Sequence, residues 1–231
     1  MASQLLIALL VTAAFAALAY ALGMVSRDGA LGGFVVGTLI YASLGPQGFT
    51  ILALFVAGGS LLTRLGYLSK QRAGAAQEHG GRRGAGNAFA NCAVGVHCAV
   101  LSALTGAPSF TAAFAASLGA AFADTAESEV GQIYSRTPRL ITTFAKVRPG
   151  TEGAISLPGT LAGITAAALT AALGFALGLV GDPGAMLLVT LAAFLGTVAD
   201  SLIGALTPRA GNELTNLICT LTAAALVLLL V

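Results

Sequence analysis

Residues 110–131 read Phe-Thr-Ala-Ala-Phe-Ala-Ala-Ser-Leu-Gly-Ala-Ala-Phe followed by Ala-Asp-Thr-Ala-Glu-Ser-Glu-Val-Gly. An apolar segment therefore ends in three carboxylates, Asp124, Glu127 and Glu129, in a chain with nine acidic residues. Acids at the end of a membrane helix are costly unless they pair with cations or a metal ion. Asp124, Glu127 and Ser128 share one helix face. These hard oxygen ligands are typical of Mg²⁺ held beside phosphates; a solvated helix end is the simpler alternative.

The composition indicates an integral membrane protein. The 231 residues are 57% hydrophobic and 9% charged, whereas soluble domains carry roughly a quarter charged residues. We predict one all-α domain over residues 1–231, a polytopic membrane helical bundle whose 30 glycines allow close helix packing. Nothing indicates a nucleic-acid partner, and a homodimer stays open. Three cysteines lie in apolar runs without zinc-site spacing, so we interpret them as packing residues: Cys92, Cys98 and Cys219.

The apolar runs predict about seven or eight transmembrane segments. Gly/Pro-rich turns separate several of them. The second run is short and Gly-rich, which leaves open whether it is tilted or re-entrant. The predicted segments are 3–25, 30–44, 48–68, 87–106, 109–130, 154–181, 184–207 and 213–231.

The basic residues define the predicted orientation. With eight crossings, all 11 Lys and Arg residues fall on the side of loops 69–86 and 131–153. The positive-inside rule makes that side cytoplasmic and places both termini outside the cell membrane. The acids follow the same side, except Asp182. Charge gathered at one end favours cytoplasmic chemistry on a membrane-resident substrate, whereas a transporter usually needs polar groups along its whole path.

Two short motifs recur and suggest an internal pseudo-repeat. Ala-Asp-Thr at 123–125 returns as Ala-Asp-Ser at 199–201, again late in an apolar helix. Gly-Asn-Ala-Phe-Ala-Asn at 86–91 returns as Gly-Asn-Glu-Leu-Thr-Asn at 211–216. Repeats of this kind are common in membrane folds with a site between two halves. We predict that Asp200 joins Asp124 as a metal ligand; a buried carboxyl that only fixes helix packing is the alternative.

Both basic loops contain groups suited to phosphate. Arg82 and Arg83 precede Asn87 and Asn91, and Arg83 shares a helical stripe with both amides, which predicts a phosphate clamp. Lys70 and Arg72 could equally anchor the loop to anionic lipid. The second loop offers the hydroxyls of Thr142 and Thr143, the cations Lys146 and Arg148, and a Gly-Thr-Glu-Gly turn containing Glu152. Carboxylates followed by such a loop fit Mg²⁺-nucleotide binding and phosphoryl transfer.

Together these stretches resemble the integral-membrane family that includes the phytyl-phosphate kinases. The resemblance covers most of the chain, although Ala126 and Ala154 depart from the family pattern. The matching stretches are Arg83 with Asn87 and Asn91, residues 123–131, 138–143, 150–156 with 159–160, 200–205, and Asn212 with Asn216.

The resemblance implies a CTP-dependent kinase that converts an isoprenyl monophosphate (phytyl, geranylgeranyl or farnesyl phosphate) into the diphosphate. Asp124, Glu129 and Asp200 would hold Mg²⁺ on the nucleotide phosphates, and Glu127 would orient or relay. The expected nucleotide site comprises Thr142, Thr143, Lys146, Arg148, Glu152 and Ser156, with Lys146 also acting in catalysis. The expected site for the acceptor phosphate comprises Arg82, Arg83, Asn87, Asn91, Asn212 and Asn216. A cytidylyltransferase of a lipid phosphate and a transporter of small ions or lipid phosphates are the competing interpretations.

Overall fold

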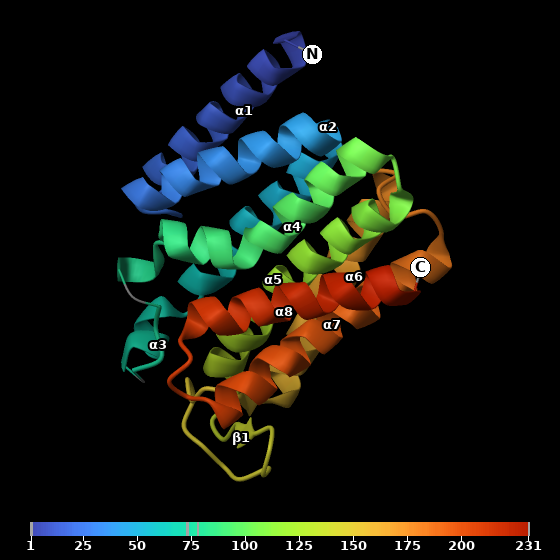
Figure 1. The fold of residues 1–231 in the computed structure, drawn as a ribbon. Coiled ribbons are helices and arrows are strands. Elements are labelled where there is room, and N and C mark those ends of the chain that lie inside the picture. Colours follow the sequence, from blue (N-terminus) through green and yellow to red (C-terminus); the bar gives the residue numbers. More distant parts are fainter. Residues whose placement is uncertain (1, 73, 78, 231) are drawn as a thin grey trace.

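The computed structural model describes residues 2–72, 74–77 and 79–230, and it is almost entirely helical (Figure 1). Six of its helices are long and apolar enough to cross a membrane. The elements in chain order are α1 (Ala2–Ala21), α2 (Arg27–Arg64), α3 (Tyr67–Arg72), η1 (His79–Gly81), α4 (Ala85–Thr105), α5 (Pro108–Tyr134), β1 (Arg139–Leu140), β2 (Ala154–Ile155), α6 (Leu157–Ala176), α7 (Pro183–Leu206) and α8 (Asn212–Leu230). This confirms the predicted all-α membrane bundle.

Helix α2 is a hairpin of two antiparallel halves. Gly45 adopts φ 65° and ψ −160°, a conformation that favours glycine, and Pro46 follows it. A straight helix would separate Gly29 from Gly59 by about 45 Å. Both glycines instead lie against Arg83, Gly29 at its carbonyl oxygen and Gly59 at its guanidinium. The predicted segments 30–44 and 48–68 are therefore the two arms of one hairpin.

Helix α5 is the centre of the bundle and packs against α2, α4, α6, α7 and α8. Its residues from Ala112 to Ala123 are all buried, and most are Ala or Gly. Small side chains let neighbouring backbones approach closely. At Gly159 an added Cβ would lie 2.6 Å from the carbonyl oxygen of Glu127, so α5 and α6 meet almost backbone to backbone.

The two ends of the bundle differ in character. Both termini lie at the end opposite to α3 and β1 (Figure 1). Counting the two arms of α2 separately and adding α5 to the other spanning helices gives eight passes, which accounts for this placement. A short antiparallel ladder pairs Arg139 with Ile155 and Leu140 with Ala154, and it closes loop 141–153 at the α3 end. The loops rich in Lys and Arg thus gather at one end, as the charge pattern predicts.

Close glycine contacts give a test of the packing between α7 and α8. An added Cβ at Gly196 would lie 2.6 Å from the carbonyl oxygen of Cys219, a backbone atom that cannot rotate away. We expect Gly196→Ala to lower the free energy of unfolding by about 1–3 kcal/mol. The control is Gly33→Ala in α2, where the added methyl group meets no atom within 4 Å. Thermal unfolding in detergent measures both variants; equal melting temperatures would show that the helices separate more easily than this contact implies.

Candidate functional site

A polar cleft of about 1000 Å³, including its open mouth, lies at the charged end of the bundle. It opens between helices α4, α5, α7 and α8 and is covered by the loop that leads into α6. Both aspartates of the repeated motif line it, so the two halves of the chain meet there. The predicted site residues in its wall are Arg83, Asn87, Asp124, Glu127, Glu129, Glu152, Ser156, Asp200, Asn212 and Asn216.

Helix ends shape the electrostatics of the cleft. Asn87 lies in the first turn of α4, Asn212 begins α8, and Ser156 caps α6 by accepting a hydrogen bond from the Gly159 amide at 3.2 Å. Three helix N-termini therefore converge here, and N-terminal amides attract anions. Asp124 and Asp200 come instead from the C-terminal halves of α5 and α7. The cleft thus offers amide ends for anions and carboxylates for cations.

Carboxylates outnumber cations in the wall. Asp124, Glu127, Glu152 and Asp200 are close enough to repel one another. Glu127 is held by Thr160, whose hydroxyl donates a hydrogen bond to Oε1 at 3.0 Å. Asp200 Oδ1 is buried and has no hydrogen-bond partner in the described structure. A buried oxygen of this kind is usually satisfied by water or an ion.

Among the described residues, Arg83 is the cation that lines the cleft. Its Nη1 donates to Asn87 Oδ1 at 3.3 Å, and its Nη2 donates to Thr125 Oγ1 at 3.2 Å. The guanidinium carbon lies 5.7 Å from the centre of the Phe55 ring. Burial lowers the pKa of Arg83, whereas the charges of Glu129 and Asp124 oppose that shift. An arginine stays charged under these conditions, so the guanidinium is a fixed positive group.

The backbone around Arg83 is tied to the link between α1 and α2. The Ser26 amide donates to the Arg83 carbonyl oxygen at 3.1 Å, and the Arg83 amide donates to the Met24 carbonyl oxygen at 3.2 Å. Asp28 Oδ2 accepts a hydrogen bond from the Ala85 amide at 2.9 Å. These contacts hold the start of α4 beside the first helices, so Arg83 is positioned by its main chain as well as by its side chain.

Glu129 forms a buried ion pair with Lys70. The Lys70 ammonium group contacts Glu129 Oε2 and also donates to the carbonyl oxygens of Thr63 at 2.8 Å and Leu62 at 3.2 Å. Lys70 is 1% exposed and Glu129 is 2% exposed. Lys70 is therefore not a lipid anchor. One carboxylate oxygen of Glu129 is thus bound by Lys70, while Oε1 is buried and has no hydrogen-bond partner in the described structure. Glu129 is also among the residues that line the cleft.

Glycine contacts set the position of the loop that covers the cleft. Gly153, at φ 71°, lies so close to α7 that an added Cβ would be 2.5 Å from the carbonyl oxygen of Ser201. Gly204, one turn further along α7, also packs against the loop, because an added Cβ there would lie 3.1 Å from the Gly153 amide nitrogen. The preceding residue, Glu152, is thereby brought to the cleft beside Asp200.

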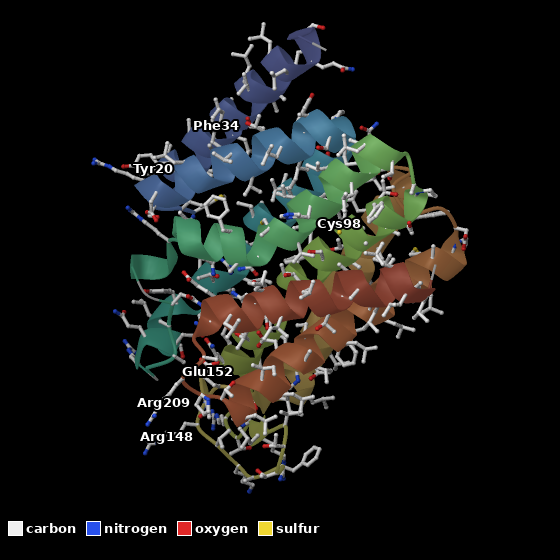
Figure 2. The ribbon with its side chains drawn as sticks, in the orientation of Figure 1. Tyr20, Phe34, Cys98, Arg148, Glu152 and Arg209 are labelled. Carbon is white, nitrogen blue, oxygen red and sulfur yellow. The ribbon has the colours of Figure 1, made fainter. Side chains whose placement is uncertain are left out.

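Other predicted site residues lie apart from the cleft. The outer part of the loop is exposed, and Figure 2 shows Arg148 directed away from the bundle. Arg82 is exposed beside Gly23, and Asn91 is buried and donates to the Asn87 carbonyl oxygen at 2.9 Å. The assignment to nucleotide or phosphate binding stays a prediction for these residues: Arg82, Asn91, Thr142, Thr143, Lys146 and Arg148.

Sequence reasoning missed several residues of the wall. Thr125 lies within the quoted acidic motif, yet its contact with Arg83 depends on how α4 packs on α5. Ser201 and Thr215 belong to the repeated motifs and face the cleft beside Asp200 and Asn216. Gln77 and Gln132 also line the cleft, and nothing in their sequence context sets them apart from other polar loop residues.

The described residues contain no group of three or more His, Cys, Asp or Glu side chains spaced to hold a metal ion by themselves. Mg²⁺ is usually held by one or two carboxylates together with substrate phosphates and water. The unpartnered oxygen of Asp200 and the nearby Asp124 are therefore suitable ligands for a cation that arrives with a phosphate.

A family model described as "Integral membrane protein DUF92" matches residues 10–224. The chain belongs to this family. It is 37% identical over 84% of its length to an uncharacterised membrane protein of Synechocystis sp., of which the match covers 77%. It is 36% identical over 78% of its length to Protein VTE6, chloroplastic, of Arabidopsis thaliana, but spans 55% of that protein. The resemblance to the phytyl-phosphate kinase family is confirmed at this level.

The relatives extend beyond bacteria and plants. An uncharacterised membrane protein of Methanocaldococcus jannaschii is 36% identical, with 84% of this chain and 81% of the relative covered. No solved structure matches the chain.

The effect of the buried Lys70–Glu129 ion pair on stability can be distinguished from that of an exposed charge. We expect Lys70→Met to lower the free energy of unfolding by about 3–5 kcal/mol, because it leaves the Glu129 charge buried and unpaired. The exposed neighbour Arg72 is the control, and Arg72→Met should change stability by less than about 0.5 kcal/mol. The double variant Lys70→Met/Glu129→Met should recover much of the loss. Chemical or thermal unfolding in detergent measures all three; similar values for Lys70→Met and Arg72→Met would contradict the pairing.

Proposed function

We propose that the protein is a membrane kinase that transfers the γ-phosphoryl group of a nucleoside triphosphate, with CTP as the favoured donor, to an isoprenyl monophosphate. Membership of the DUF92 family together with Protein VTE6 supports a lipid-phosphate substrate. The observation that carries the proposal is the cleft, in which a fixed arginine and three helix N-termini face a set of carboxylates. A metal-dependent phosphoryl transfer requires anion-binding and cation-binding groups side by side in one cleft.

The acidic wall gives a physical reason for Mg²⁺. A triphosphate would be repelled by Asp124, Glu127, Glu152 and Asp200 unless divalent cations stood between the two sets of oxygens. Asp124 and Asp200 are the proposed ligands, and Glu129 Oε1 is available to a third position. When bound, the metal ion neutralises charge on the phosphates. The carboxylates of Asp124 and Asp200 would determine where the positive charge of the metal ion lies.

In the proposed reaction an oxygen of the acceptor phosphate attacks the γ-phosphorus of CTP. The bond between the γ-phosphorus and the β,γ-bridging oxygen breaks, and CDP leaves with the electron pair. An acceptor phosphate is already an anion, so no general base is needed. Arg83 and Asn87 would hold the acceptor phosphate, while the amide ends of α6 and α8 would face the donor phosphates.

Product analysis tests this function against its nearest competitor. Purified protein is incubated with geranylgeranyl phosphate, Mg²⁺ and CTP labelled in its γ-phosphate. The kinase predicts labelled geranylgeranyl diphosphate and release of unlabelled CDP. A cytidylyltransferase would release labelled pyrophosphate and form a CDP-linked lipid. Transport is less well supported, because α5 is lined by buried small apolar residues over most of the stretch from Ala112 to Ala123.

The carboxylate roles are tested by isosteric substitutions. Asp124→Asn and Asp200→Asn should each lower turnover at least about a hundredfold while leaving the melting temperature near that of the wild type, since the amide keeps the shape but weakens metal binding. Asp182→Asn is the matched control, because Asp182 caps α7 at the opposite end and Asn is an equally good cap. Retained turnover in Asp200→Asn would return Asp200 to a packing role.

The charge pattern leads us to propose that the cleft faces the cytoplasm and that both termini lie outside the cell membrane. Gln77 is exposed at the cleft end and Gly181 lies at the opposite end. The three native cysteines are buried, which keeps background labelling low. In oriented vesicles, a cysteine at Gln77 should react with an impermeant thiol reagent added from the cytoplasmic side and one at Gly181 from the other side. The reverse pattern would contradict this orientation.

A further inference from the structure

A second, apolar cavity lies between α1, the α2 hairpin and α4, and it meets the polar cleft at Arg83 and Asn87. These two residues line both spaces. From them the apolar cavity extends into the bundle along side chains that are apolar or small. Its wall includes Thr12, Phe15, Ala16, Ala30, Gly33 and Phe49. A phosphate held by Arg83 would therefore have an apolar space directly behind it.

The depth of the cavity follows from helix geometry. Its lining on α1 runs from Ala19 to Thr12, and seven residues of helix correspond to about 10 Å. The inner end is closed by packed aromatic rings, because Phe15 and Phe49 meet edge to face with centroids 5.2 Å apart. Thr12 Oγ1 lies 2.8 Å from Thr38 Oγ1 and closes the same end. The space is thus deep enough for the first part of a prenyl tail, but it has a floor.

An apolar groove on the lipid-facing surface lies next to this cavity. An apolar groove runs along the outside of α1 and α2, and Ala16 and Ala30 line both the groove and the cavity. Figure 2 shows Tyr20 and Phe34 beside this edge of the bundle. Arg27 also lines the groove, and its Nε donates to the Tyr20 hydroxyl at 3.2 Å. A cation thus stands at the charged end of an apolar groove that opens toward lipid.

We propose that this apolar cavity holds the proximal part of the isoprenoid tail, and that the substrate enters sideways from the bilayer between α1 and α2, past Ala16 and Ala30. The inference rests on the proposed function, since it takes the acceptor to be a prenyl monophosphate. Arg27 first attracts the phosphate at the groove, and Arg83 then holds it at the junction of the two cavities. The remainder of a long tail stays in the bilayer through the same passage. Gly33 lines this cavity, and an added Cβ there would meet no atom within 4 Å, so a larger side chain at this position would occupy open space.

Filling the cavity tests the proposal. Gly33→Leu places an isobutyl group into the open space without a backbone clash. Turnover is measured with geranylgeranyl phosphate and with the short acceptor dimethylallyl phosphate. We expect Gly33→Leu to lower the ratio of kcat/KM for the long acceptor over the short acceptor by at least about tenfold, the size of effect that a few methylene groups produce in a hydrophobic site. Ala42→Leu, on an exposed face of the same helix, is the matched control and should leave the ratio unchanged. An equal ratio in both variants would overturn the tail site.

A second measurement does not depend on turnover or on a variant that folds. A geranylgeranyl phosphate analogue with a diazirine in its second isoprene unit is photo-crosslinked to the wild-type protein, and the labelled peptides are identified. The proposal expects crosslinks in residues 12–19 and 29–36, competed by unlabelled geranylgeranyl phosphate. Crosslinks confined to the α4–α8 surface would overturn it. If the wild type phosphorylates no prenyl phosphate yet gives the expected crosslinks, the kinase function fails while the tail site stands.

Discussion

The half-buried guanidinium of Arg83 is the group on which the rest of the site depends. Its main chain is tied to the link between α1 and α2, its side chain binds Asn87 on α4 and Thr125 on α5, and it packs over Phe55 on α2. Gly29 and Gly59 make room for it, since an added Cβ at Gly29 would lie 2.1 Å from the Arg83 carbonyl oxygen. A cation that is partly withdrawn from water is stabilised by anions nearby, which relates the acidic cleft to the arginine beside it.

The bundle provides a polar environment and an apolar environment on opposite sides of Arg83. On one side of Arg83 the wall is made of carboxylates, amides and helix N-termini, and on the other side it is made of aromatic and small residues. A prenyl phosphate has the same two-part character, with a charged head and an apolar tail. The Lys70–Glu129 pair has a structural role. It ties α3 and the end of α2 to α5 and so supports the mouth of the cleft.

Much of this could be predicted from the sequence, and the reasons are local. Asp124 and Asp200 stand out because a carboxylate at the end of an apolar helix is expensive, and the repeated motifs placed Asn87, Asn212 and Asn216 beside them. The eight passes followed from apolar runs and charge alternation. The partner of Glu129 could not be found in this way, because it depends on how a short helix 59 residues away packs against α5. The apolar cavity could not be predicted from the sequence either, since the helices around it are apolar along most of their length and no residue type marks the cavity.

The outer loop shows a different limit. Thr142, Thr143, Lys146 and Arg148 have the composition of a phosphate-binding loop, yet their side chains are exposed. The turn is held in this position by the β1–β2 ladder and by Arg139, whose Nη1 donates to the Phe144 carbonyl oxygen at 2.7 Å. Composition identifies which groups a loop offers, but the hydrogen bonds of its backbone decide where those groups lie.

We propose that one cleft holds the metal ion and the acceptor phosphate together. The most direct measurement is electron–nuclear double resonance with Mn²⁺ in place of Mg²⁺, in the presence of CDP and a prenyl monophosphate. In the wild type but not in Asp124→Asn, we expect ³¹P couplings from the prenyl phosphate that place it in the immediate surroundings of the metal ion. A distance beyond about 12 Å between the metal ion and the phosphorus of the prenyl phosphate would be too long for one metal–phosphate cluster with metal–oxygen bonds of roughly 2.0–2.6 Å, and it would rule out a shared cleft.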